Sequence, residues 1–283
     1  MAVFGRIHQR LLLTGVVDAQ QVRSPQLAER AVLERVHCPD YVRAFCSGTL
    51  LPAALRRMGL PWSEALVERT LAEVGGTLLT AELALQHGLA CNTAGGTHHA
   101  HRDAGSGFCI LNDLAVTALS LLDRGLCQRV LIVDLDVHQG DGTATLLAGE
   151  PRAFTLSLHC EDNFPARKAT SSLDVPLPAG TDDDAYLAVL SQVLPTVLSS
   201  HAPDLVLYDA GVDVHGGDTL GRLALTDQGL WRREMCVLSS CLALGVPVAG
   251  LVGGGYHPDL DVLAARHCVL HRAAAQAWRD FKL

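Results

Sequence analysis

The stretch VLIVDLDVHQGDG, residues 130–142, is the part of the sequence from which the rest can be interpreted. It begins with an apolar, mostly β-branched run at residues 130–133, which predicts a strand buried on both faces. Asp134, Asp136 and His138 follow at alternate positions, so an extended backbone would point them to one side. Such ligands at the carboxyl end of a strand indicate a metal site, and solvated charges at a strand end are the simpler alternative.

Composition limits the class of protein. The chain has 283 residues, of which 49% are hydrophobic and 18% charged, as in ordinary globular proteins. The formal net charge of -8 argues against nucleic acid or an anionic membrane surface as the main partner. The nine cysteines include no Cys-x-x-Cys pair, which argues against a disulfide framework or a thiolate zinc site. A reducing compartment, the cytoplasm, is expected, without a signal peptide or a membrane span.

The pattern of apolar residues predicts an α/β fold in a single domain over residues 1–283. Residues 4–85 are expected to be helical, including a long helix that begins near Ser63, an N-cap candidate. Strands and helices then alternate. The expected strands are 89–93, 130–134, 154–158, 205–208 and 246–252, and the expected helices are 108–122, 182–200, 226–244 and 258–277. This alternation predicts a central parallel sheet with helices on both faces and a shared rim of loops after the strands.

Further polar clusters follow other expected strands, so they can converge on that rim. The loop at 94–107 carries the adjacent His98 and His99 between glycines, and a flexible loop with incidental histidines is the alternative. The sequence DAGVD occupies residues 209–213, and GGGY occupies residues 253–256. None of these glycines falls in a nucleotide-phosphate motif.

These residue types together predict metal-assisted chemistry. Asp136, His138 and Asp213 supply three ligands and leave a metal open to water and substrate. Two carboxylates make this set harder than three histidines, which suits Zn²⁺, with Fe²⁺ as the alternative. Adjacent histidines can handle protons if carboxylates hold them, and Tyr256 can donate a hydrogen bond to an oxyanion. We therefore expect hydrolysis of an amide by a metal-activated water.

The sequence resembles the arginase-fold zinc deacetylases, which are the histone deacetylases, acetoin-utilisation proteins and acetylpolyamine amidohydrolases. The resemblance spans about residues 5–275 and rests on GGTHHAHRDAGSGFCILND, VDLDVHQGDGT, DAGVDVHGGD and GGGY in this order. Three further motifs resemble the bacterial branch nearest the class IV enzymes: NFPARK, DVPLP and LGRLALT. The family implies a zinc-dependent deacylase that acts on an acylated lysine or a small acylated amine.

The resemblance also implies a role for each matching residue. The zinc ligands would be Asp136, His138 and Asp213. His99 would be the general base and then the general acid, and His98 its electrostatic and hydrogen-bonding partner. Their carboxylate partners would be Asp134 for His98 and Asp141 for His99. A K⁺ ion would bind beside the zinc, at Asp134, Asp136, His138, Ser157 and Leu158. Tyr256 would stabilise the oxyanion, and the substrate would be lined by Gly107, Phe108, Leu220, Gly254 and Gly255.

Some expectations stay open at this point. Family chains usually begin with an extra strand and a tunnel-mouth loop, whereas this sequence opens in a helix, so either the mouth is more open or the sequence begins late. His101, His159, His215 and His257 are expected around the site or facing solvent, and Asp218 is expected to structure a loop. The competing functions are a binuclear manganese ureohydrolase-like enzyme and a non-catalytic protein that binds acyl ligands. Acyl length and oligomeric state are not determined by the sequence.

Overall fold

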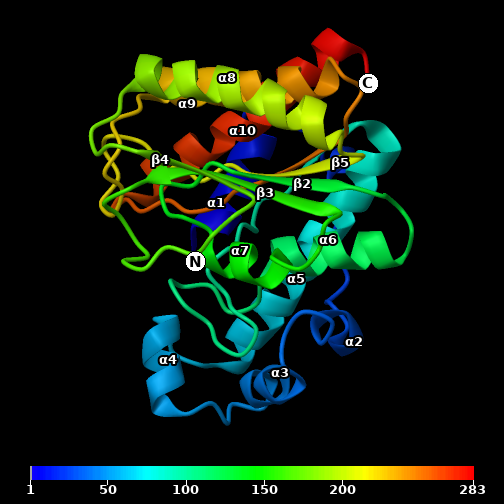
Figure 1. The fold of residues 1–283 in the computed structure, drawn as a ribbon, viewed down its shortest axis with the longest axis vertical. Coiled ribbons are helices and arrows are strands. Elements are labelled where there is room, and N and C mark those ends of the chain that lie inside the picture. The colour runs from blue at the N-terminus through cyan, green and yellow to red at the C-terminus, as the bar shows by residue number, and fades with distance from the viewer. Residues whose placement is uncertain (1) are drawn as a thin grey trace.

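The computed structural model describes residues 2–283 and contains a wholly parallel sheet of six strands in the order β1-β6-β5-β2-β3-β4 (Figure 1). The strands are β1 Leu89–Cys91, β2 Val130–Asp134, β3 Ala153–Cys160, β4 Leu173–Leu177, β5 Leu205–Asp209 and β6 Val248–Leu251. The predicted parallel α/β sheet is confirmed. The edge strand β4 was not expected, because its sequence LDVPL contains a proline, which cannot donate a hydrogen bond to a neighbouring strand.

Helices cover both faces of this sheet. They are α1 Ala2–Leu13, α2 Arg30–Leu33, α3 Pro39–Cys46, α4 Pro52–Met58, α5 Glu64–His87, α6 Asp113–Asp123, α7 Asp141–Leu147, α8 Asp183–His201, α9 Asp227–Leu242 and α10 Leu260–Phe281, with a 3-10 turn at Ala19–Gln21. In Figure 1, α8, α9 and α10 lie on one side of the sheet, and α5, α6 and α7 lie on the other. The short helices α2, α3 and α4 extend the second side, and α1 packs on α10.

The central strand β2 is continuously apolar because its side chains are buried on both faces of the sheet. Leu131 and Val133 pack into the core formed with α1, α8, α9 and α10. Val130 and Ile132 pack into the opposite core, formed with α5 and α6. Both pairs are fully buried, so the sheet has no solvated face at this strand.

Side-chain caps fix where several helices begin. Ser63 accepts a hydrogen bond from the backbone N–H of Leu66, which confirms it as the N-cap of α5. The helix expected to begin at residue 108 instead begins after its N-cap Asn112. Phe108 adopts a positive φ of 64°, so residues 108–111 stay in the loop. The helix α7 was not expected, because the glycines around Asp141 indicated only the end of β2.

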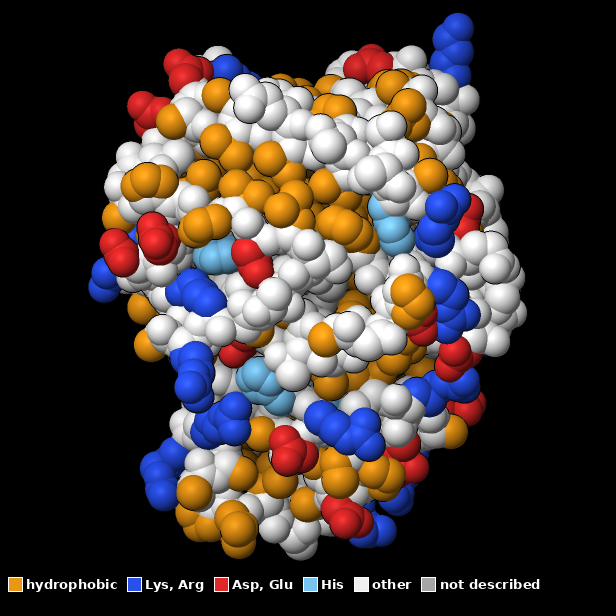
Figure 2. Space-filling view, viewed as in Figure 1, with side chains coloured by type: hydrophobic (Ala, Val, Ile, Leu, Met, Phe, Trp, Pro, Cys, Tyr) orange, Lys and Arg blue, Asp and Glu red, His pale blue; other side chains and the backbone are white. Residues whose placement is uncertain are grey.

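The surface is mixed in character. Figure 2 shows Lys and Arg side chains interspersed with Asp and Glu on one face of the molecule, and hydrophobic side chains gathered between α8 and the sheet. Among the described residues, none of the helices has both the length and the apolar character that a membrane crossing requires.

Candidate active site

Four loops meet at the carboxyl edge of the sheet and bring the predicted residues together. They follow β1, β2, β5 and β6 and contain residues 92–112, 135–140, 210–226 and 252–259. This is the edge at which open parallel sheets place their sites. The prediction that the polar clusters converge is confirmed by hydrogen bonds between them. His98 bonds to Asp134, Asp213 accepts from the N–H of Val137, and Asp136 accepts from the N–H of Gly254.

The backbone beyond β2 is not extended, which corrects the alternation expected for this stretch. The strand ends at Asp134, and the backbone bends at residues 136–138. Asp134 Oδ1 accepts from the N–H of Asp136, and Asp136 Oδ1 accepts from the N–H of His138, so short side chains hold the bend. Asp134 therefore lies in a different cluster from Asp136 and His138.

Asp136, His138 and Asp213 form a buried cluster with the character of a metal centre. One donor atom from each lies within 4.8 Å of the others. His138 Nδ1 is 3.0 Å from Asp136 Oδ1 and 3.2 Å from Asp213 Oδ2. Burial lowers the pKa of His138, but the carboxylates of Asp136 and Asp213 beside it outweigh burial and raise that pKa to about 10. Burial and the charge of Asp136 raise the pKa of Asp213 to about 7. The cluster therefore favours a cation.

The space around these atoms also suits a metal ion. Asp213 Oδ2 is buried and has no hydrogen-bond partner among the described residues. A Cβ added to Gly254 would collide with Asp136 Oδ2 and lie 2.5 Å from Asp213 Oδ2. Gly254 thus keeps the space between the carboxylates free of side chain. Two carboxylates and one imidazole are a ligand set that Zn²⁺ accepts, with room for a fourth ligand.

The two adjacent histidines are each held by a carboxylate. His98 Nδ1 lies 2.8 Å from Asp134 Oδ2, and His99 Nδ1 lies 2.7 Å from Asp141 Oδ1. Burial lowers the pKa of His98, but Asp134 and Asp136 raise it well above its ordinary value. Burial and the charge of His98 lower the pKa of His99 to about 3. The pair therefore combines one charged and one neutral imidazole, which are the two proton states that acid–base chemistry needs.

His101 extends the second of these pairs. Its Nε2 lies 3.2 Å from Asp141 Oδ2, so both oxygens of Asp141 face a histidine. These hydrogen bonds, against the effect of burial, hold the pKa of Asp141 well below its ordinary value. His101 was expected near the site, but its contact with Asp141 was not, because the resemblance assigned Asp141 to His99 alone.

Asp209 is a buried carboxyl group that the sequence did not single out as a site residue. Neither of its oxygens has a hydrogen-bond partner among the described residues, and Oδ2 lies 3.7 Å from His98 Nδ1. Burial and the charge of Asp134 raise its pKa well above the ordinary value. With His98 and Asp134 it forms a second group of donor atoms within 4.8 Å. A sequence signal for Asp209 did exist, because β2 and β5 both end in an aspartate. The structure pairs these two residues, Asp134 and Asp209, in neighbouring strands.

Aromatic side chains line the approach to these residues. The ring of Phe108 lies 5.9 Å from that of Tyr256, and the ring of Phe164 lies 4.8 Å from that of His99 at 90°. Phe108 and Phe164 are partly exposed. Leu220 is also exposed, and its carbonyl accepts a hydrogen bond from Asn163. Phe164 was missed, because its motif indicated family membership without a position in the fold.

Tyr256 and the glycines before it stand beside the metal ligands. The ring of Tyr256 lies 6.3 Å from that of His138. Burial and the charge of Asp213 raise the pKa of Tyr256 well above its ordinary value, so its hydroxyl remains a donor. Asp218 accepts from the N–H groups of Tyr256, Leu220 and Gly221, which confirms its structural role.

The remaining predicted residues lie at the margins of this constellation. Ser157 pairs with Asp134 in the register of β2 and β3, and Leu158 follows it, so these three residues of the expected K⁺ site lie on neighbouring strands. His159 Nδ1 is 3.0 Å from Ser157 Oγ. His215 and His257 instead accept hydrogen bonds from loop N–H groups two residues away.

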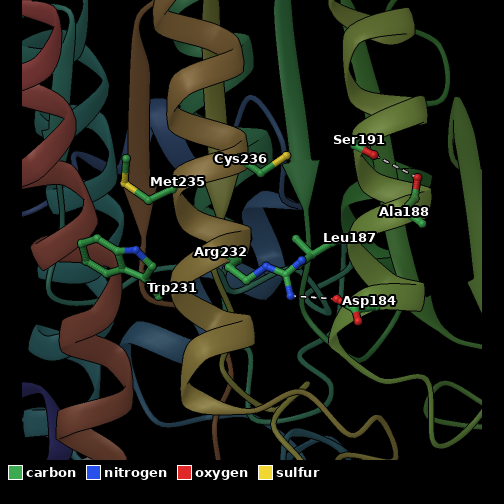
Figure 3. Close-up of a pocket in the computed structure, with 8 residues that line it drawn as sticks. All are labelled: Asp184, Leu187, Ala188, Ser191, Trp231, Arg232, Met235 and Cys236. Carbon is green, nitrogen blue, oxygen red and sulfur yellow. Dashed lines mark hydrogen bonds and ion pairs between the residues drawn. The ribbon is translucent and has the colours of Figure 1, made fainter.

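A cavity of about 600 Å³ connects the entrance with the interior. Its wall includes Phe108 and Tyr256, the two histidines, and all the glycines at residues 253–255. Beyond the histidines it reaches Val3 of α1 and Arg69 of α5. Figure 3 shows a second hollow, of about 560 Å³, beside α8 and α9, which none of the predicted site residues lines.

Comparison with known proteins agrees with this arrangement. The histone deacetylase domain matches residues 3–271. Histone deacetylase 2 of Arabidopsis thaliana is 30% identical over 89% of this chain and 68% of its own length. Histone deacetylase 8 of Xenopus tropicalis is 30% identical over 89% of this chain and 72% of its own. An uncharacterized protein of Picosynechococcus sp. is 59% identical over 98% of this chain and 93% of its own. The expected kinship with class IV enzymes stays a prediction, but the match over nearly the whole sequence means that this chain belongs to the histone deacetylase family.

Proposed function

We propose that the chain is a zinc-dependent deacylase that removes an acyl group from a lysine side chain or a small amine. Membership of the histone deacetylase family supports a hydrolase that acts on acetyl-lysine. The observation that carries the zinc proposal is the buried cluster of Asp136, His138 and Asp213, in which one carboxylate oxygen is unpartnered. The two carboxylate-bound histidines beside this cluster supply the proton chemistry of hydrolysis.

Each residue of the candidate site has a separate proposed role in the reaction. Zn²⁺ held by Asp136, His138 and Asp213 would supply a Lewis acid for the water and the carbonyl group. His99 is bonded to Asp141 through Nδ1, so its Nε2 is free to accept the proton of water and return it to the leaving amine. The Tyr256 hydroxyl donates to the oxyanion that forms on the carbonyl oxygen. His98, charged through Asp134, offsets the negative charge that develops there.

The remaining roles are proposed on the same basis. Gly107, Phe108 and Leu220 line the acyl-lysine path, and Gly254 and Gly255 border the substrate at the metal. K⁺ binds through Asp134, Asp136, His138, Ser157 and Leu158 as a structural ion. The chain acts as one catalytic domain. Its nine cysteines are all free, which supports a location in the reducing cytoplasm.

One observation favours a second candidate, a binuclear manganese enzyme. His98, Asp134 and Asp209 provide a further set of donor atoms next to the first. Against this candidate, the 2.8 Å hydrogen bond to Asp134 occupies His98 Nδ1. Counting metals separates the two functions, since the deacylase needs one transition-metal ion per chain and the binuclear enzyme needs two.

The proposal is tested by reconstitution. Protein stripped with a chelator is titrated with Zn²⁺ and assayed on acetyl-lysine and longer acyl-lysine peptides and on acetylated polyamines. We expect turnover of at least one substrate to rise in proportion to zinc, up to one ion per chain. Asp136→Asn should abolish turnover, and Asp184→Asn, an exposed change on α8, should not. If none of these substrates is hydrolysed by protein that holds one zinc per chain, the proposal is contradicted and an acyl-binding protein is favoured.

A further inference from the structure

Arg233 is a fully buried cation directly behind the candidate metal centre. It lies on α9 with an exposed fraction of 0%. Its Nη1 donates to the carbonyl oxygens of Leu135 at 3.1 Å and Gly211 at 2.7 Å. Its Nη2 donates to the carbonyl oxygen of Ala210 at 3.3 Å. One guanidinium group therefore joins the loop after β2 to the loop after β5.

These two loops carry the residues that would hold zinc. Leu135 stands immediately before Asp136, and Gly211 stands two residues before Asp213. The loops approach so closely that a Cβ added to Gly211 would collide with Asp136 Oδ2. Asp213 Oδ1 also accepts from the N–H of Val137 at 2.8 Å. A shift of either loop would therefore change the separation of the Asp136 and Asp213 carboxylates.

The groups around Arg233 hold its orientation. Glu234, the next residue, accepts from Nη2 at 2.6 Å, and its other oxygen accepts a short hydrogen bond from the Tyr208 hydroxyl. The side chains of Arg233 and Glu234 are both fully buried. A buried ion pair is a poor source of stability, because the desolvation of two charges opposes their attraction. A planar fork of donors, by contrast, suits several fixed carbonyl groups, which the point charge of lysine cannot bind in the same way.

We propose that Arg233 is a positioning residue that sets the separation of the two ligand-bearing loops. The proposal rests on the metal centre of the proposed function. The hydrogen bonds of Arg233 go to Leu135, Gly211, Ala210 and Glu234, none of which is proposed to contact substrate, so its loss should act on metal binding and on kcat rather than on KM. Mutation of residues that hold metal ligands in place from outside the ligand set typically lowers metal affinity or activity by about 10–100-fold.

The test uses Arg233→Lys in the full chain, with Arg232→Lys as the matched control. Arg232 is the neighbouring residue, exposed and paired with Asp184 at 2.8 Å (Figure 3). Zinc affinity is measured by competition with a chromophoric chelator, without substrate, and kcat and KM are measured on an acetyl-lysine peptide. We expect Arg233→Lys to weaken zinc binding by about tenfold or more and to lower kcat at nearly constant KM. Arg232→Lys should change neither.

A second variant separates positioning from stability. Arg233→Met with Glu234→Leu replaces the ion pair by apolar side chains, an exchange that often preserves folding. If the thermal midpoint of this double variant is retained while zinc affinity falls, the positioning role is supported. Zinc affinity equal to the parent protein in either folded variant would overturn it. Absence of deacylase activity in the parent protein would refute the proposed function alone, because the affinity measurement needs no substrate.

Discussion

His37 should make the protein sensitive to mild acid. It is fully buried, and its Nδ1 lies 2.9 Å from the carbonyl oxygen of His101. Its Nε2 accepts from the N–H of Asn112 at 2.9 Å, which leaves the proton on Nδ1 and the ring neutral. Burial lowers the pKa of His37 to about 4. Protonation would therefore break the hydrogen bond to Asn112, which is the N-cap of α6 and donates to the carbonyl of His98.

The size of the effect follows from this pKa. Because the folded pKa is below the ordinary value of 6.5, the contribution is complete above pH 6.5 and is lost as pH falls towards 4. A shift of about 2.5 pH units corresponds to about 3 kcal/mol of unfolding free energy in strong acid, since each unit is worth about 1.4 kcal/mol. Between pH 7 and pH 5, His37 alone should account for about 2 kcal/mol.

The assay is urea denaturation of metal-free protein at pH 7, 6 and 5, for the parent chain and for His37→Gln. Glutamine can still accept a hydrogen bond but does not titrate, so the variant should lose about 2 kcal/mol less than the parent over this range. The other buried histidines with lowered pKa, which are His99, His159, His267 and His271, affect both proteins equally. His87→Gln, at an exposed site, should behave as the parent does. Parallel pH dependences for the parent and His37→Gln would refute the reasoning.

Three further substitutions test the site and the core. Gly254→Ala places a methyl group against the oxygens of Asp136 and Asp213, so calorimetry should show zinc affinity reduced by about tenfold or more, with Gly149→Ala, in open space, unchanged. Equal zinc affinity would contradict the fit of the metal. Phe164→Ala removes the ring beside His99 and should raise KM for acyl-lysine peptides more than it lowers kcat; an unchanged KM would remove Phe164 from the substrate path. Leu190→Ala, in the fully buried core, should lower the unfolding free energy by about 2–5 kcal/mol in urea without altering zinc binding, and a loss under 1 kcal/mol would be inconsistent with that burial.

The sequence predicted the parts of the fold that depend on local patterns. The bounds of β2 were correct, because a buried parallel strand requires an uninterrupted apolar run. The start of α5 was correct, because a serine cap acts through its own hydroxyl within three residues. The edge strand β4 was missed, because its residues depend on pairing with β3 rather than on a periodicity of their own.

Some contacts of the candidate site were predictable from the sequence and others were not. The pairing of His98 with Asp134 and of His99 with Asp141 was expected from the family motifs, and both hydrogen bonds are present. Arg233 was not expected, because its acceptors are backbone carbonyls, which leave no residue-type signal in the sequence. Helical periodicity alone cannot distinguish it from the exposed Arg232 beside it.

The most direct test of the proposed deacylase is Tyr256→Phe. The change removes only the hydroxyl proposed to donate to the oxyanion, beside metal ligands that it leaves intact. Turnover of an acetyl-lysine peptide and zinc content are measured on the same preparation. We predict one zinc per chain in both proteins and a kcat lower by about 10²–10³-fold in the variant. An unchanged kcat at one zinc per chain would contradict the proposed catalytic arrangement.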